Sequence, residues 1–205
     1  MTTDLSAQDA PFTRHVLDTA GRLFAAHGPE AVSLDAVAAE AGVDPADVRR
    51  AFPSKLALVH RLVLDRVRAL VEHGPAAEAS APPVAQMRRL IRRHIEFNCR
   101  HRTELELCRA LLPTLRTMSP VRYRELSRLL RAYQDRIHRI LERGRADGVF
   151  SPGGGSREPV TAATVLSTLE SSLNWYEPDA RMTPEQLGDV YEDLVLHHLL
   201  GVARD

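Results

Sequence analysis

Apolar residues recur every three or four positions along most of the chain, which is the spacing of one face of an α-helix. The first such stretch runs from Pro11 to His27 and ends at Gly28-Pro29, a pair typical of helix C-termini. Two short helices are predicted over residues 33–40 and 44–51, each opened by a capping residue. Longer helices are expected over residues 54–74, 84–101, 103–115, 120–148, 159–175 and 184–202. Because strand-like alternation is rare, the pattern predicts an all-α fold.

The predicted helices fall into a small head and a larger body. We expect residues 1–53 to form a three-helix head, residues 54–74 a linking helix, and residues 75–205 a helical bundle. The stretch from Gly74 to Pro83 is rich in Ala, Pro and Ser and is typical of a connector. Thr183 and Gln186 have the spacing of a capping box at the start of the last helix.

Charge and composition indicate the cellular location of the protein more clearly than its biochemical activity. The 27 basic and 27 acidic residues give a formal net charge of zero, so any affinity for nucleic acid must be local. No apolar run reaches the roughly 20 residues that cross a bilayer, and the N-terminus lacks the order of a signal peptide. Cys99 and Cys108 suit thiols in a reducing compartment. We expect a cytoplasmic protein without a membrane partner.

The segment from Leu34 to Pro53, LDAVAAEAGVDPADVRRAFP, has the spacing of a helix-turn-helix. Ala38 is small where the two helices approach each other, and Val48 packs back against the first helix. Gly42 falls in the turn, where a left-handed backbone suits glycine. The second helix is therefore expected to protrude, as one that enters a major groove must.

The longer run LDTAGRLFAAHGPEAVSLDAVAAEAGVDPADVRRAFPSKLALVHRLV resembles the N-terminal signature of the TetR family, over roughly residues 12–65. The resemblance implies an N-terminal DNA-binding head followed by a ligand-binding and dimerisation domain. It also implies DNA contacts from the cap before the second helix, from the third helix and from the lysine that opens the fourth. With the start of the third helix included, the candidate DNA-binding residues are Ser33, Asp44, Pro45, Arg49, Arg50 and Lys55.

Two features depart from that signature. Arg49 stands where the family usually has tyrosine, and Asp44 where it usually has serine, so operator contacts should differ from the family pattern. Acidic residues also outnumber basic residues across the head: Asp4, Asp9, Asp18, Glu30, Asp35, Glu40, Asp44 and Asp47 against Arg14, Arg22, Arg49, Arg50 and Lys55. We therefore expect modest non-specific affinity for DNA.

The segments ERGRADGVF and NWYEPDARMTPEQL resemble the C-terminal half of TetR-type regulators of fatty-acid and steroid degradation. The resemblance implies a hydrophobic effector, with a fatty-acyl or steroid-derived CoA thioester as one candidate and a general multidrug-type effector as the other. The expected lining is Phe97, Arg100, Leu107, Leu111, Tyr123 and Trp175. Cations for the CoA phosphates are expected among Arg88, Arg89, Arg92, Arg93, Arg100 and Arg102. These arginines could equally form a solvated face over an ordinary core.

The last two predicted helices carry small and apolar residues that suit a four-helix homodimer contact: Ala162, Val165, Leu166, Leu169, Leu187, Val190, Tyr191, Leu194 and Leu200. The alternative is that they complete each monomer's core. Paired heads would favour a dimer in either case.

Other chemistries are poorly supported. His94, Cys99, His101 and Cys108 do not place three metal ligands on one helical face, so we expect no metal site. Nucleophile elbows, phosphate-binding glycine loops and metalloprotease helices are missing from the sequence, so we expect neither an enzyme nor a cofactor. The acidic head leaves a helical adaptor that binds protein as an alternative to a ligand-responsive repressor that binds operator DNA.

Overall fold

The computed structural model describes residues 5–72, 80–151, 158–177 and 182–204. Its helices are α1 (Leu5–His27), α2 (Leu34–Ala41), α3 (Pro45–Ala51), α4 (Lys55–Glu72), α5 (Pro83–Arg100), α6 (Arg102–Met118), α7 (Pro120–Ala146), α8 (Ala162–Glu170), α9 (Ser172–Trp175), α10 (Pro184–Asp193) and the π-helix η2 (Leu194–Leu199). The described residues contain no β-strand, which confirms the all-α prediction.

The chain forms two compact units. The first comprises Met1–Arg66 and Thr103–Tyr123, and the second comprises Val67–Arg102 and Arg124–Asp205. The helix expected to link head and body is shared between them, because α4 passes from the first unit to the second after Arg66. Helix α6, expected in the body, lies almost entirely in the first unit.

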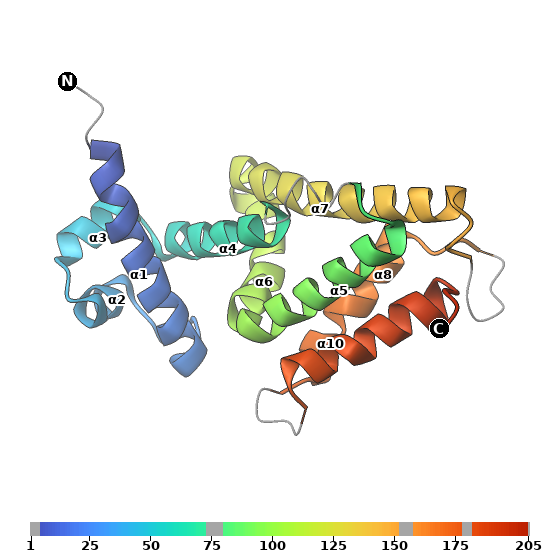
Figure 1. Cartoon of the computed structure of the whole chain (residues 1–205). Coiled ribbons are helices and arrows are strands. Elements are labelled where there is room, and N and C mark those ends of the chain that lie inside the picture. The colour runs from blue at the N-terminus through green and yellow to red at the C-terminus, as the bar shows by residue number, and fades with distance from the viewer. Residues whose placement is uncertain (1–4, 73–79, 152–157, 178–181, 205) are drawn as a thin grey trace. The chain divides into compact units, whose positions relative to one another are not determined.

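The first unit buries one apolar face from each of its N-terminal helices. Val16, Ala20 and Phe24 supply the buried face of α1, and Val37 and Ala38 that of α2. The side chains at Val48, Phe52, Leu58 and Leu62 are also buried. Figure 1 shows α1 running past both α2 and α3. The helix-turn-helix is therefore held by apolar contacts on its inner side.

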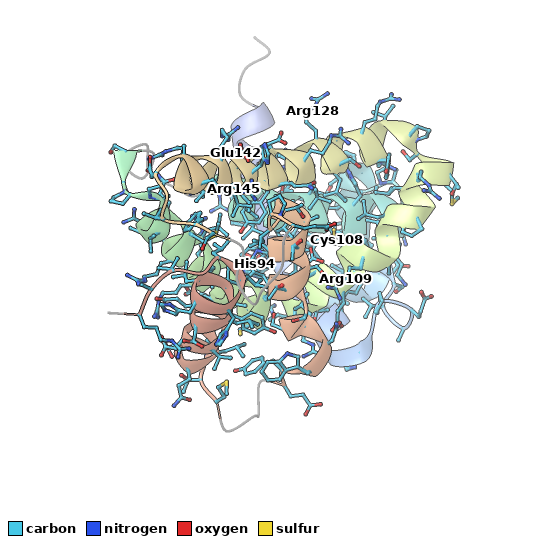
Figure 2. All side chains as sticks on the ribbon, turned by 90° about the vertical axis from the view of Figure 1, so that its right-hand side faces the viewer. His94, Cys108, Arg109, Arg128, Glu142 and Arg145 are labelled. Carbon is cyan, nitrogen blue, oxygen red and sulfur yellow. The ribbon has the colours of Figure 1, made fainter. Side chains whose placement is uncertain are left out.

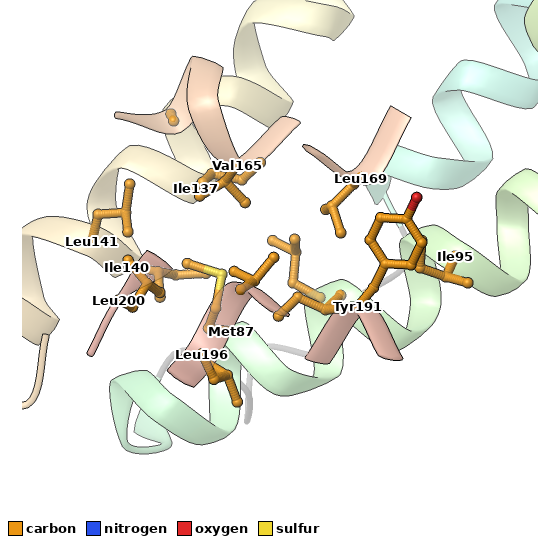
Figure 3. Packing of buried hydrophobic residues seen from close by; sticks show 14 of the residues in the cluster. Met87, Ile95, Ile137, Ile140, Leu141, Val165, Leu169, Tyr191, Leu196 and Leu200 are labelled. Atoms are coloured by element: carbon orange, nitrogen blue, oxygen red, sulfur yellow. The ribbon is translucent and has the colours of Figure 1, made fainter. Parts of the chain in front are cut away.

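The second unit is built around a larger apolar cluster, shown in Figure 3. Met87, Ile91 and Ile95 line the inner face of α5. Further members come from the other helices of the unit: Ile137, Ile140, Leu141, Val165, Leu169, Leu187, Tyr191, Leu196 and Leu200. Helices α5 and α10 lie side by side (Figure 1) and are also joined by ion pairs.

Several helix boundaries differ from the sequence prediction. Helix α1 begins at Leu5, so Pro11 lies in its second turn and removes one intrahelical hydrogen bond. The helix predicted over 159–175 is broken at Ser171. Near this break the Leu169 carbonyl accepts hydrogen bonds from the Asn98 and Ser172 side chains. The last predicted helix changes to π geometry after Asp193, where Leu200 N donates to the Val195 carbonyl five residues back. The Thr183–Gln186 capping box is confirmed.

Most of the residues expected at a dimer contact complete the core of the monomer instead. Val165, Leu169, Leu187, Tyr191 and Leu200 are all buried within the second unit, and the alternative given by the sequence is correct for them. Because α8 and α10 pack against α5, their apolar stripes face inward. Val190 and Leu194 do lie on the surface, with exposed fractions of 45% and 38%.

Candidate nucleic-acid interface

The α2–turn–α3 segment has the caps that the sequence predicts. Ser33 is the N-cap of α2, and its hydroxyl accepts a hydrogen bond from Ala36 N at 3.0 Å. Gly42 ends α2 with a φ of 66°, a left-handed conformation that strains most other residues. Val43 N then donates to the Ala38 carbonyl at 3.1 Å. The turn between the helices is therefore fixed by local hydrogen bonds.

Helix α3 presents a polar outer side. Val48 is fully buried against the unit, whereas Arg49 and Arg50 are exposed. Asp44 is the N-cap and accepts from Ala46 N at 2.7 Å, and Pro45 follows as the first helical residue. Both residues are exposed. The short helix therefore offers its first turn and its two arginines to solvent.

The basic side chains of this segment all have partners. Arg49 pairs with Asp35 of α2, and Arg50 pairs with Asp47 at 2.7 Å. Lys55 opens α4, and its Nζ donates to the Glu30 carbonyl at 3.2 Å. Asp35 and Asp47, the partners of these arginines, are not among the site residues predicted from the sequence. The Asp47–Arg50 spacing of three is readable from the sequence, whereas the Asp35–Arg49 contact depends on how the two helices cross.

Arg66 joins three helices of the first unit. Its Nη2 lies 2.7 Å from Asp18 Oδ1 on α1, and its Nε lies 3.4 Å from Glu104 Oε1 on α6. Gly21 of α1 leaves room for this carboxylate, since an added Cβ would lie 3.5 Å from Glu104 Oε1. The ion pairs of Arg66 therefore connect α6 to α1.

The residues expected to line an effector pocket divide between the two units. Leu107 and Leu111 are buried and Tyr123 is half-buried in the first unit. In the second unit, Phe97 packs against the apolar cluster and Arg100 is exposed beside Glu96 at 2.7 Å. Trp175 is 52% exposed, and its Nε1 donates to Tyr191 Oη at 3.0 Å.

The arginines on α5 and at the start of α6 bind different partners. Arg88 and Arg92 reach the Glu192 carboxylate on α10 at 2.5 and 2.6 Å, and Arg92 also reaches Asp189 at 2.6 Å. Hydrogen bonding to Asp189 raises the pKa of Arg92 above its ordinary value. Arg93 donates to the Ala69 carbonyl at 3.1 Å, and Arg102 donates to the Tyr176 carbonyl. Several of these cations therefore hold the second unit together.

A buried polar pair lies inside the second unit. His94 Nδ1 is 2.9 Å from Tyr133 Oη, and Figure 2 shows His94 in the interior whereas Arg128 of α7 extends outward. Burial lowers the pKa of His94 to about 4, and no partner for its Nε2 lies among the described residues. Tyr133 also lines a cavity of about 20 Å³, room for about one water, together with Leu70, Arg89, Leu90, Arg93 and Arg136.

Within the described residues, no helix combines the length and the apolar character needed to cross a membrane. The same residues bring together no group of three or more His, Cys, Asp or Glu side chains that could hold a metal ion.

Comparison with known proteins identifies two family models along the chain. Residues 16–62 match the model described as bacterial regulatory proteins, tetR family. Residues 80–199 match the tetracyclin repressor-like, C-terminal domain. No curated protein matches the chain.

Solved structures resemble the chain over nearly its whole length. PfmR, a TetR family transcriptional regulator from Thermus thermophilus, is 28% identical with a TM-score of 0.74, over 90% of this chain and 98% of that one. The ketosteroid transcriptional regulator KstR2 of Mycobacterium tuberculosis is 21% identical with a TM-score of 0.67, over 94% and 95%. AibR in complex with isovaleryl coenzyme A and operator DNA is 21% identical with a TM-score of 0.70, over 90% and 97%. The latter two likenesses establish the fold alone.

Proposed function

Because the chain belongs to the tetR family of bacterial regulatory proteins, we propose that it is a repressor which a hydrophobic small molecule releases from its operator. Family membership makes it a DNA-binding transcriptional regulator and not an enzyme. We also assign the protein to the cytoplasm, where operator DNA is accessible.

The observation that carries the proposal is the polar outer side of the α2–turn–α3 segment. Arg49 and Arg50 are exposed on α3, Ser33 is exposed at the start of α2, and Lys55 lies at the N-terminus of α4. An ammonium group beside the unsatisfied N–H groups of a helix N-terminus favours a phosphate. We assign Ser33 and Lys55 to backbone contacts and the first turn of α3, with Asp44 and Pro45, to the groove edge.

A homodimer would present two such heads to successive half-sites. Val190 and Leu194 support a contact through the C-terminal helices, since both are apolar and exposed. The outer side of α8 adds exposed small residues at Ala163, Thr164 and Ser167, which allow close helix approach. We propose that this smaller set replaces the wider apolar stripe expected from the sequence.

For the effector, we favour a CoA thioester over a general multidrug-type ligand. Within the second unit, Phe97 and Trp175 supply apolar surface and Arg100 a cation, whereas the lining role of Leu107, Leu111 and Tyr123 in the first unit stays a prediction from the sequence. Three further cations, Arg89, Arg93 and Arg136, line the cavity beside Tyr133, and guanidinium groups bind phosphate well. AibR was solved with isovaleryl coenzyme A and operator DNA, which makes a thioester a reasonable first probe.

A mobility-shift assay with fragments of the protein's own promoter region tests the DNA-binding part. Acyl-CoAs, free fatty acids, CoA alone and cationic drugs are then added to the complex. Release by a thioester and not by CoA alone supports the effector assignment, and release by the drugs alone favours the multidrug-type effector. Absence of salt-sensitive, sequence-selective binding would contradict the repressor function.

A further inference from the structure

Both arginines of α3 are held by carboxylates of the same unit. Arg49 pairs with Asp35 in the first turn of α2, and Arg50 pairs with Asp47 on its own helix. The Arg49 and Asp35 side chains are 56% and 61% exposed, so the pair lies on the surface rather than in the core. The segment that would face DNA therefore presents cations that already have anionic partners.

A DNA phosphate and the Asp35 carboxylate compete for the same guanidinium group, that of Arg49. A guanidinium has five N–H donors, of which an oxyanion takes two in a bidentate contact. Arg49 Nη2 donates to Asp35 Oδ1, so a phosphate bound by Arg49 must displace the carboxylate or lie beside a second negative charge. Both outcomes weaken contacts to the DNA backbone, which supply most of sequence-independent binding.

A contact between Arg49 and a base edge differs from a contact with a phosphate. Guanine offers two neutral acceptors, O6 and N7, which do not repel a neighbouring carboxylate as a phosphate does. Arg49 keeps donors that Asp35 does not use, and the ion pair restricts the guanidinium to fewer orientations. The carboxylate that opposes backbone contacts is thus compatible with a base contact.

We propose that Asp35 is a specificity-determining residue, which acts through Arg49 to weaken binding to unrelated DNA more than binding to the operator. The inference rests on the proposed function, because it takes the α2–turn–α3 segment as the DNA-binding surface. Asp35 also lies in the first turn of α2, where an acidic side chain stabilises the helix dipole. That structural role alone predicts a loss of stability without a change in selectivity.

The test compares Asp35→Asn with Glu40→Gln, which removes the same charge near the other end of α2. Each full-length variant is titrated with a random-sequence duplex and with a duplex that the wild-type chain enriches from a random library. Asp35→Asn should raise affinity for the random duplex roughly two- to fivefold, the size of one exposed ion pair. The dependence of log K on log salt should steepen by up to about 0.9 as Arg49 engages a phosphate.

The ratio of enriched-duplex to random-duplex affinity should fall for Asp35→Asn and stay near the wild-type value for Glu40→Gln. In an Arg49→Ala background the effect of Asp35→Asn should shrink, and thermal unfolding checks that every variant is folded. Equal gains from the two charge removals, an unchanged ratio, or a full effect without Arg49 would each overturn the proposal. Failure to enrich any sequence would contradict sequence-selective operator binding, whereas the random-duplex comparison still decides whether Asp35 competes for Arg49.

Discussion

His94 on α5 and Tyr133 on α7 form a hydrogen bond of 2.9 Å inside the apolar core of the second unit. Both side chains are buried, and their rings stack with centroids 5.7 Å apart. Burial raises the pKa of Tyr133 and lowers that of His94, so both groups are neutral near pH 7. The pair joins two helices through a polar contact that water cannot replace easily.

Replacing Tyr133 with Phe should destabilise the protein even though the ring volume is kept. The change leaves His94 Nδ1 buried without its partner, which costs about 1–3 kcal/mol. Urea unfolding of the two proteins measures the difference. An unchanged midpoint and slope would mean that the hydrogen bond adds nothing to stability.

The same histidine should make stability depend on pH. Its pKa is about 4 in the folded protein, against an ordinary value of about 6.5 that applies to the unfolded chain. Between these values the unfolded chain binds a proton that the folded protein does not, so this contribution is complete above about pH 6.5 and falls toward pH 4. The loss reaches up to about 3 kcal/mol at the lower end.

His94→Gln lacks the titrating group, and its free energy of unfolding should fall less over this range. The measurement is a series of urea titrations of both proteins between about pH 7 and pH 4. Parallel curves for the wild type and the variant would show that other groups cause the acid sensitivity.

The helix-turn-helix could be predicted because its signals are local. Ser33, Gly42 and Asp44 cap or end the helices within four residues of the groups they bond. The break at Ser171 was not predictable, because it coincides with hydrogen bonds from Asn98 on α5 to Leu169 and Ser172. Contacts between residues 70 or more positions apart cannot be predicted from the spacing of apolar residues along the sequence.

The partners of the charged residues also could not be predicted from the sequence. Arg88 and Arg92 have the spacing of an exposed helical face, and the sequence pattern makes them candidates for binding the phosphates of a ligand. In the structure they bind Glu192, about 100 residues away along the chain. Whether an arginine serves a ligand or the fold depends on tertiary neighbours, and the same is true of Arg49 and Asp35.

Gly144 is expected to tolerate no side chain. A Cβ at this position would lie 1.9 Å from Phe150 Cδ2, and Phe150 is buried in the core of the second unit. Gly144→Ala should therefore shift Phe150 or the end of α7 and cost about 1–3 kcal/mol or more. Thermal unfolding monitored by circular dichroism measures the loss.

Gly188 within α10 is the matched control. The nearest atom to an added Cβ there is Arg92 Cγ at 3.8 Å, an ordinary contact. Gly188→Ala should stabilise the helix by about 0.5–1 kcal/mol, because alanine loses less backbone entropy than glycine. The reverse order of the two variants would contradict the packing described for α7 and α10.

The two carboxylates of α10 that bind α5 should differ in importance. Glu192 is 12% exposed and accepts from Arg88 and Arg92, whereas Asp189 is 63% exposed and accepts from Arg92. We expect Glu192→Gln to cost about 1.5–3 kcal/mol and Asp189→Asn at most about 1 kcal/mol. Added salt should reduce the Asp189 effect more, because solvent ions screen exposed pairs better. Equal costs at all salt concentrations would contradict this ranking.

Lys55→Ala should weaken DNA binding about equally for every sequence. The ammonium group lies at the N-terminus of α4 and contacts the Glu30 carbonyl, which leaves two of its three N–H donors for a phosphate. A backbone contact carries no base information, so selectivity should be retained, and the slope of log K against log salt should become shallower by about 0.9.

The control for Lys55→Ala is Arg22→Ala, which removes one positive charge from α1 outside the α2–turn–α3 segment. Arg22→Ala should change the slope less. A charge that does not touch the DNA acts on it only through solvent, and at 0.1 M salt such an interaction is screened beyond about 10 Å. Both variants should unfold near the wild-type temperature, since each loses only an exposed or half-buried polar contact. Titrations of one duplex at several salt concentrations provide the slopes. A Lys55→Ala slope equal to the wild-type slope would remove Lys55 from the interface, because a cation that binds phosphate must release counterions when DNA binds.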